Sequence, residues 1–362
     1  MSLHGHTNHS KEGLQFIPEF AQRFSLLQWA LEKQKSVSLL PVDFDQAYWT
    51  PPLTPKQAYD LESGQIENVL GLASIVSLTD HDNIEAPALL RLVPEVRHVP
   101  LSLEWSVPFR GTIFHLGIHN LPEGNAAEIV ADLAFYTLNP NEKRLTELLA
   151  SLDEDPDVLI VFNHPLWEQR STGGQAFAQT VEQFLEVNCR FLHALELNAT
   201  RSWKENYRAL QLAERWGRPV VSGGDRHATE PSAVLNFTEA ESLPEFIHEI
   251  RDGGLSHIVF MPQYQEPLCL RTMKTLLDII REYPENPVGS RRWDDRVFHP
   301  GRPRELMQPL SALWRRPPVA IERIFSIFRL AENDSVGRAL KLMLTEDLEP
   351  NRPIDFPSEA LL

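Results

Sequence analysis

Residues 1–260 alternate short apolar runs with longer amphipathic stretches, and this rhythm limits the fold more than any other feature of the sequence. Seven runs are typical of buried strands: residues 73–78, 99–103, 112–116, 158–162, 194–197, 219–222 and 257–261. Helices are expected at 55–70, 142–151, 181–187 and 203–216, the first capped by Thr54 with Pro55 as its first residue. Such alternation predicts a parallel sheet or a (β/α) barrel, with chemistry at the carboxyl ends of the strands.

Two segments interrupt this rhythm. Residues 14–55 are too long for a simple connection and are either a lid or a packed structural insertion. Residues 282–318 contain seven prolines and several arginines, and two amphipathic helices are expected after them, near 321–330 and 335–344. We therefore expect a barrel domain at 1–262, with a helical insertion at about 14–55, and a C-terminal extension at 263–362. This extension is expected to be a Pro/Arg-rich arm and a helical tail that pack on the barrel.

Composition excludes several classes of protein. The net charge is −16, from 34 Lys and Arg against 50 Asp and Glu, which argues against broad binding to nucleic acid or anionic membrane. The two cysteines, Cys189 and Cys269, exclude a disulfide scaffold and a cysteine-rich zinc site, and they suit a reducing compartment. No apolar run approaches the roughly 18 residues of a membrane helix. These features predict a cytoplasmic protein without a membrane partner.

Histidines and carboxylates gather at the predicted strand ends. His4 and His6 flank Gly5, so an extended backbone points both imidazoles to one side. The other groups are Asp80-His81-Asp82, Glu104, His115, His164 and Asp225-Arg226-His227. A single histidine at a strand end is usually structural, but burying this many titratable groups together is costly unless metals compensate them. The pattern therefore favours a multinuclear metal site.

The same residues carry a family resemblance. The chain resembles the PHP family, named for polymerase and histidinol phosphatase, over roughly residues 1–260. The matching segments, in the family's order, are His4-Gly5-His6-Thr7, Thr79–Asp82, Glu104, His115, Asn163-His164-Pro165 and Asp225-Arg226-His227. Each segment is short, but the ordered set is specific. The resemblance implies a distorted (β/α)7 barrel that holds up to three divalent metals.

The resemblance also implies which residues bind each metal. It places His4, His6, Glu104 and Asp225 on a first metal, from which Glu104 bridges to a second metal held by His115 and His164. A third metal would be bound by Glu12, His81 and His227, with His9 as the alternative to Glu12. These mixed nitrogen and oxygen ligands suit Zn, Mn or Fe in a trinuclear site of two to three cations. The chain departs from the family pattern at Ser2, where an acidic residue is usual, and at Arg226, where a small residue is commoner.

This ligand set predicts a hydrolase. Clustered divalent metals activate a bridging water and clamp a phosphoryl oxygen, and the resemblance narrows the substrate to a phosphomonoester or a nucleotide, attacked by a metal-bridging hydroxide. Asp80 or Asp82 is expected to orient His81. His227 would protonate the leaving group if the third metal is absent. One of Arg226, Arg170 and Arg201 is expected to bind the substrate phosphate.

Two alternatives stay open. The first is a nuclease or an RNA 5′-end trimming phosphodiesterase on the same site, with the arm gripping the strand; the Asp and Glu interleaved in the arm favour a solvated strap instead. The second is a non-catalytic module that binds metal or a partner, and the full ligand set argues against it. Phosphate release from phosphomonoesters, nucleotides and oligonucleotides discriminates among the three.

Overall fold

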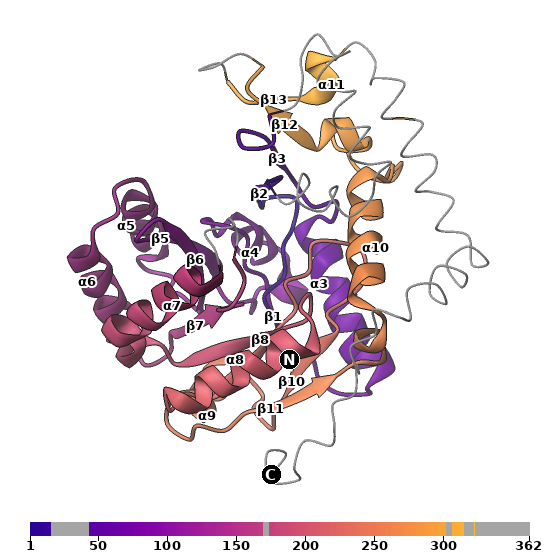
Figure 1. Cartoon of the computed structure of the whole chain (residues 1–362). Coiled ribbons are helices and arrows are strands. Elements are labelled where there is room, and N and C mark those ends of the chain that lie inside the picture. Colours follow the sequence, from indigo (N-terminus) through magenta and orange to yellow (C-terminus); the bar gives the residue numbers. More distant parts are fainter. Residues whose placement is uncertain (16–42, 169–173, 302–305, 315–321, 323–362) are drawn as a thin grey trace. The chain divides into compact units, whose positions relative to one another are not determined.

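Figure 1 presents the computed structural model of the chain, which describes residues 1–15, 43–168, 174–301, 306–314 and 322. The chain divides into two units. The first includes Met1–Ser10 and Leu53–Leu268, and the second includes Lys11–Pro52 and Cys269–Leu348. The histidine segments of the sequence all fall in the first unit.

A five-stranded sheet is the largest element of the first unit. Its strands, in spatial order, are β5 (Leu103–Phe109), β6 (Thr112–His119), β7 (Leu159–Asn163), β8 (Ala194–Asn198) and β9 (Val220–Gly223). β7, β8 and β9 are parallel, as the alternation predicts, but β5 pairs with β6 and β6 with β7 in antiparallel fashion. The expectation of a wholly parallel sheet is therefore wrong for its first strands.

A tight hairpin explains this difference. Arg110 and Gly111, which join β5 to β6, have φ values of 47° and 83°, and two-residue hairpin turns of type I′ need positive φ at both positions. The hairpin moves the first strand to 103–109, downstream of the expected 99–103. Glu104 consequently lies near the start of β5 and His115 in the middle of β6. The sequence pattern predicted that both residues lie at the carboxyl ends of strands, and this prediction is wrong.

Further strands flank this sheet. β1 (Ser2–Leu3) runs parallel to β4 (Val76–Ser77), which is shorter than the expected strand 73–78. β11 (His257–Phe260) was expected, and its antiparallel partner β10 (Val234–Phe237) was not. Isolated bridges join Gly5 to Arg226 and His81 to Glu104. Among the described residues, no sheet closes on itself, so the fold is mixed α/β.

The helices of the first unit follow local sequence signals. They are α3 (Pro55–Gly64), α4 (Glu85–Leu90), α5 (Ala126–Leu138), α6 (Glu142–Asp153), α7 (Gly174–Asn188), α8 (Trp203–Arg215) and α9 (Leu243–Arg251). Thr54 caps α3 in a capping box with Gln57, and a π-helical turn at Gln65–Val69 extends it. The side-chain oxygens of Asn141 and Ser202 cap α6 and α8 by accepting hydrogen bonds from the N–H groups of Arg144 and Glu205. All four expected helices are confirmed.

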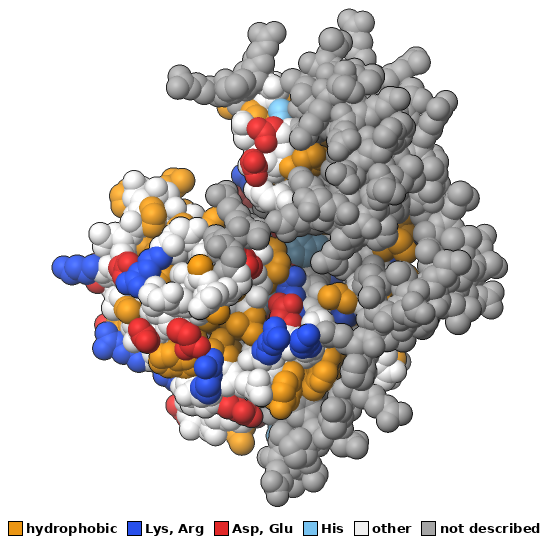
Figure 2. Space-filling model, viewed as in Figure 1, with side chains coloured by type: hydrophobic (Ala, Val, Ile, Leu, Met, Phe, Trp, Pro, Cys, Tyr) orange, Lys and Arg blue, Asp and Glu red, His pale blue; other side chains and the backbone are white. Residues whose placement is uncertain are grey.

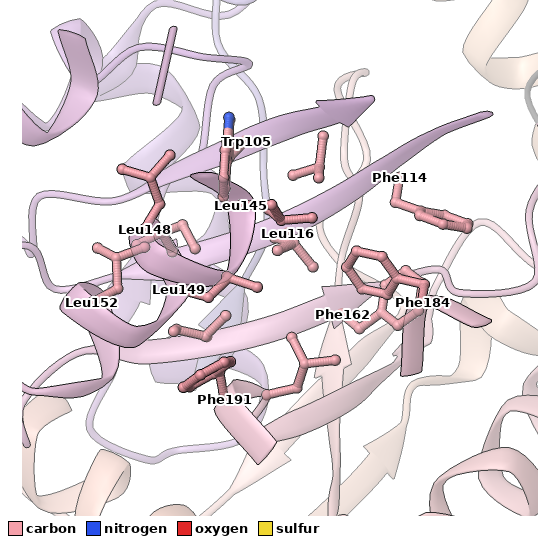
Figure 3. Packing of buried hydrophobic residues seen from close by; sticks show 14 of the residues in the cluster. Trp105, Phe114, Leu116, Leu145, Leu148, Leu149, Leu152, Phe162, Phe184 and Phe191 are labelled. Carbon is pink, nitrogen blue, oxygen red and sulfur yellow. The ribbon is translucent and has the colours of Figure 1, made fainter. Parts of the chain in front are cut away.

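The main apolar core packs helices against one face of the five-stranded sheet (Figure 3). Phe114 of β6, Phe162 of β7 and Phe184 of α7 contact one another in this core, with ring centroids 4.8–5.3 Å apart. Leu145 and Leu149 of α6 are fully buried in the same cluster. This packing fixes the strand that carries His115 and the strand that His164 directly follows.

The surface of the first unit carries mixed charge. Figure 2 shows acidic and basic side chains interspersed over its helices, and ion pairs such as Arg215–Glu182 join α8 to α7. Within the described residues, no helix is both long enough and apolar enough to cross a membrane.

The second unit has its own sheet and core. β2 (Glu12–Gly13), β3 (Tyr48–Trp49), β12 (Val297–His299) and β13 (Gln308–Pro309) form an antiparallel sheet. α10 (Leu268–Ile280) and α11 (Leu310–Leu313) complete the described elements. Trp49, Trp293 and Trp314 are buried in its apolar cluster. Most of the expected insertion, at 16–42, and both helices of the expected tail lie outside the described residues.

Candidate metal centre

One buried carboxylate is surrounded by imidazoles. Glu104 is 1% exposed. Five histidines each place a ring nitrogen 3.1–3.4 Å from one of its oxygens: His4, His6 and His81 face Oε2, and His115 and His164 face Oε1. These side chains come from strands and loops far apart in the sequence. The structure therefore brings together the central residues that the sequence pattern singled out.

A second carboxylate lies beside this group. Asp225 Oδ1 is 3.6 Å from His6 Nε2, 3.8 Å from His4 Nε2 and 3.4 Å from His227 Nδ1. The imidazoles of His6 and His227 stack with their centroids 4.2 Å apart. Asp225 and His227 thus extend the cluster from the loop that follows β9.

The loop after β8 orients Asp225. Its Oδ2 atom accepts hydrogen bonds from Thr200 Oγ1 at 3.0 Å and from Asn198 Nδ2 at 3.2 Å. Arg201 Nη2 lies 3.5 Å from the same oxygen. Because Oδ2 is engaged by this loop, Oδ1 is directed toward the histidines. The sequence pattern did not indicate Asn198 or Thr200.

Glu196 is the most important residue that the sequence pattern missed. This carboxylate, 1% exposed, accepts a hydrogen bond from His4 Nδ1 at 2.5 Å. Its other oxygen accepts from the backbone N–H of His164 and from Asn198 Nδ2, both at 2.8 Å. One signal was present, because Glu196 is a charged residue in the middle of the apolar run 194–197. A Cβ at Gly223 would overlap this carboxylate, so the position needs glycine.

Three groups of side chains have ligand atoms close enough to hold a metal ion. His4, His6 and Glu104 form the first, His81, Glu104 and His115 the second, and His6, His81 and His227 belong to the third. Within each group the ligand atoms lie within 4.8 Å of one another. Glu12, predicted for the third site, begins β2 in the second unit, and its assignment to a metal stays a prediction.

The backbone is strained at several cluster residues. His4, His164 and Asp225 have φ values of 63°, 27° and 45°. Residues with a Cβ rarely adopt positive φ, and such conformations concentrate at functional sites. Each of these residues follows directly on, or closely after, a strand.

The charges of the cluster support one another. Burial alone would raise the pKa of Glu104, but His4, His115 and His81 outweigh it and hold that pKa well below its usual range. Burial would also raise the pKa of Asp225, but His227, together with His6, His4 and His164, holds that pKa well below its usual value. Burial lowers the pKa of His4, but the nearby Glu104 and Glu196 carboxylates hold it well above its ordinary value. Both carboxylates are therefore anionic at neutral pH.

The two aspartates beside His81 make backbone contacts. Asp80 accepts hydrogen bonds from the N–H and the hydroxyl of Thr7, both at 2.6 Å. Asp82 Oδ1 accepts from the N–H of Ser106 at 2.7 Å. Asp80 thus fixes the segment that follows His6, and Asp82 is tied to the middle of β5. The orientation of His81 by either residue stays a prediction.

The three candidate arginines have different placements. Arg226 is buried, pairs with Glu62 and donates to two backbone carbonyls, so it fits a structural role better than contact with a substrate phosphate. Arg201 is partly exposed and lies 4.7 Å above the ring of Trp167. Trp167 also contacts the imidazole of His164, with centroids 5.1 Å apart. Arg170 lies outside the described residues.

Two histidines near the cluster have other partners. His9 Nδ1 lies 2.8 Å from the Glu85 carboxylate at the surface. His119 is the last residue of β6 and is buried, with its Nδ1 2.9 Å from Ser77 Oγ. Burial lowers the pKa of His119 to about 3, so the ring is neutral.

Comparisons with known proteins give only distant likenesses. No family model matches the chain, and no curated protein matches it. Three solved structures share 14% sequence identity with it. A protein from Bifidobacterium adolescentis, described as a candidate metal-dependent phosphoesterase, covers 55% of this chain and 91% of its own at a TM-score of 0.34. PsfC from Pseudomonas syringae covers 60% and 88% at 0.40, and an amidohydrolase from Chromobacterium violaceum, solved with sulfate and no metal, covers 62% and 92% at 0.33. These values assign neither a family nor a function.

Proposed function

We propose that this protein is a metal-dependent phosphoesterase that hydrolyses a phosphomonoester or a nucleotide. One observation carries the proposal: five imidazoles converge on the buried Glu104 carboxylate, with Asp225 beside them. Two to three divalent cations, Zn, Mn or Fe, would be held by these residues together with His227 and Glu12. Glu104 faces both sets of histidines, so it is the residue suited to bridge two cations.

The donor atoms of the cluster fit a cation. His4 Nδ1 donates a hydrogen bond to Glu196, so when a cation displaces the proton from Nε2, that nitrogen presents a lone pair. That lone pair faces Glu104 Oε2 at 3.1 Å and His6 Nε2 at 3.2 Å. Lone pairs at these distances repel one another unless a proton or a cation lies among them. Imidazole nitrogens with carboxylate oxygens are the ligands that Zn, Mn and Fe accept.

Different residues around the cluster would orient the metal ligands and bind the substrate phosphate. Bound divalent cations supply Lewis acidity toward a phosphoryl oxygen and an acidified water. Glu196 keeps the ring of His4 in the tautomer that can bind a cation, and Asn198 and Thr200 direct Asp225. Arg201, held against Trp167 beside Asp225, is placed to attract the substrate phosphate.

We also propose that the first unit is a distorted (β/α)7 barrel. Seven of its strands, β1, β4 and β5 to β9, can be followed around a ring. β1 pairs with β4, and the His81–Glu104 bridge leads from the end of β4 to β5. The Gly5–Arg226 bridge leads from the end of β9 back to β1. These single bridges support closure where the regular ladders stop.

The test begins with the chain stripped of metal by a chelator and reloaded with Mn²⁺ or Zn²⁺. Phosphate release is then measured from 4-nitrophenyl phosphate, nucleoside monophosphates and short oligonucleotides, and bound metal is counted by elemental analysis. Glu104→Gln should lower turnover by about 100-fold or more and lower the metal content. His248→Gln, at an exposed histidine outside the cluster, is the matched control and should leave both unchanged.

Other outcomes separate the alternatives. Cleavage of oligonucleotides without release of phosphate from monoesters would favour a nuclease. Full metal content without turnover of any of these esters would favour a non-catalytic module. A Glu104→Gln variant that keeps the wild-type metal content would refute the assignment of the site.

A further inference from the structure

A buried ion pair links both ends of the cluster. Arg226 lies between Asp225 and His227, and its Nε atom is 2.9 Å from Glu62 Oε1 on α3. Arg226 is 4% exposed and Glu62 is 1% exposed. We propose that Arg226 and Glu62 are positioning residues: they hold the segment of His4 and His6 in register with the loop of Asp225 and His227, so that both can bind the same cations. The proposal rests on the metal site proposed above.

Arg226 makes the connection itself. Its Nη2 donates to the carbonyl oxygen of His6 at 2.7 Å, and its Nη1 donates to that of Ala228 at 3.0 Å. Its backbone carbonyl accepts the N–H of His6 at 2.9 Å. One residue therefore fixes His6 from two sides and closes the turn that carries His227.

Glu62 holds the guanidinium in place. Its Oε2 accepts a hydrogen bond from Ser2 Oγ at 2.8 Å, and both of its oxygens lie 3.2 Å from the N–H of Ser232. Ser2 precedes His4, and Ser232 follows the loop of His227. The carboxylate thus touches both of the segments that Arg226 ties together, and it does so from a third element, α3.

Stability alone does not explain such a pair. Two charges removed from water are often no more stabilising than apolar side chains of the same volume, whereas removal of one partner leaves an uncompensated charge. This difference gives a clean experiment, because a double apolar variant can restore the fold without restoring the hydrogen bonds to His6 and Ala228.

The experiment compares Glu62→Leu, Arg226→Met and the double variant in the full chain. Each single variant should have a lower melting temperature, and the double variant should recover most of it. We expect the double variant nevertheless to bind Zn²⁺ about 10-fold or more weakly in competition with a chelating indicator. The visible spectrum of the Co²⁺-loaded double variant should also differ from that of the wild type. The matched control is Asp153→Leu with Arg251→Met, which removes an ion pair outside the cluster.

Amide hydrogen exchange of the metal-free protein tests the same link without any cation. Faster exchange at His6 and His227 in the refolded double variant supports the positioning role. Wild-type Zn²⁺ affinity, Co²⁺ spectrum and exchange rates in that variant would overturn it. If the wild-type chain binds no cation, the proposed function fails, and the exchange rates still decide whether Arg226 and Glu62 position the two segments.

Discussion

Replacing Glu196 with glutamine is the sharpest perturbation of the candidate site. The carboxylate accepts three hydrogen bonds, from His4 Nδ1, the N–H of His164 and Asn198 Nδ2. Glutamine has nearly the same shape but only one accepting oxygen. If that oxygen faces His164 and Asn198, the amide NH₂ faces His4 and forces the other tautomer of its ring. Nε2 of His4, which faces Glu104, then carries the proton and cannot bind a cation.

The opposite orientation of the glutamine amide is no better. Its NH₂ would then face the two donors of His164 and Asn198, so buried donors would oppose one another. Loss of a carboxylate that orients a histidine ligand typically weakens metal binding by about 10- to 100-fold, or about 1.4–2.8 kcal/mol. We therefore expect Glu196→Gln to lower Zn²⁺ affinity by this factor, measured in competition with a chelating indicator. The circular dichroism spectrum should show that the variant keeps its native secondary structure.

The control is the same chemical change at another carboxylate–histidine pair. Asp153 lies 2.8 Å from His193 Nε2, and neither residue belongs to the three candidate metal-binding groups, so Asp153→Asn should leave Zn²⁺ affinity unchanged. A Glu196→Gln affinity within about twofold of the wild-type value would refute the tautomer reasoning.

Three further outcomes follow from the structure. Gly223→Ala places a Cβ inside the Glu196 side chain and should weaken Zn²⁺ binding at least as much as Glu196→Gln; a wild-type titration would contradict this. Gly111→Ala, at φ 83°, should lower the free energy of unfolding by about 1 kcal/mol in urea, whereas Gly124→Ala, which has open space, should change it by less than about 0.5 kcal/mol. Burial lowers the pKa of His119 from 6.5 to about 3. As the pH falls, the His119 imidazole is therefore protonated in the unfolded chain before it is protonated in the folded chain. Stability from this residue is complete above pH 6.5 and is lost toward pH 3, and His119→Gln should flatten the fall of the urea midpoint in the metal-free protein; an equal slope would contradict the assignment.

The sequence predicted features that depend on neighbours along the chain. Thr54 and Pro55 mark the start of α3, and the amphipathic period marks α8. The spacing of His4 and His6 about Gly5 predicted that both rings lie on one side, and both do reach Glu104. The extended backbone assumed for this prediction is wrong at His4, whose φ is 63°. These features need only a few consecutive residues, so a sequence pattern carries them completely.

Features that depend on distant pairing could not be predicted. The turn at Arg110 and Gly111 lacks the Asn-Gly or Asp-Gly pair that marks a two-residue hairpin, so the reversal of β6 had no strong local signal. β3 and β12 pair only two residues each across the second unit, which is too short a ladder to leave a sequence pattern. In the sequence, Glu196 is only a charged residue that interrupts an apolar strand. Its role depends on a hydrogen bond from His4, which is distant along the chain, so no local pattern could indicate it.

The strained residues give support for the site that is independent of the histidine pattern. Left-handed φ at a residue with a Cβ costs on the order of 1–3 kcal/mol, and His4, His164 and Asp225 each adopt it. Two of these conformations are held by Glu196, because its carboxylate accepts hydrogen bonds from His4 Nδ1 and from the N–H of His164. Elsewhere in the first unit, the helix caps and the apolar core follow ordinary local preferences. Arg110 and Asn120 also have positive φ away from the cluster, but four of the six such non-glycine residues in the described part of the chain are His4, His164, Asp225 and Asp82, which is next to His81. A cation bound by the surrounding donor atoms would offset the conformational cost at these positions.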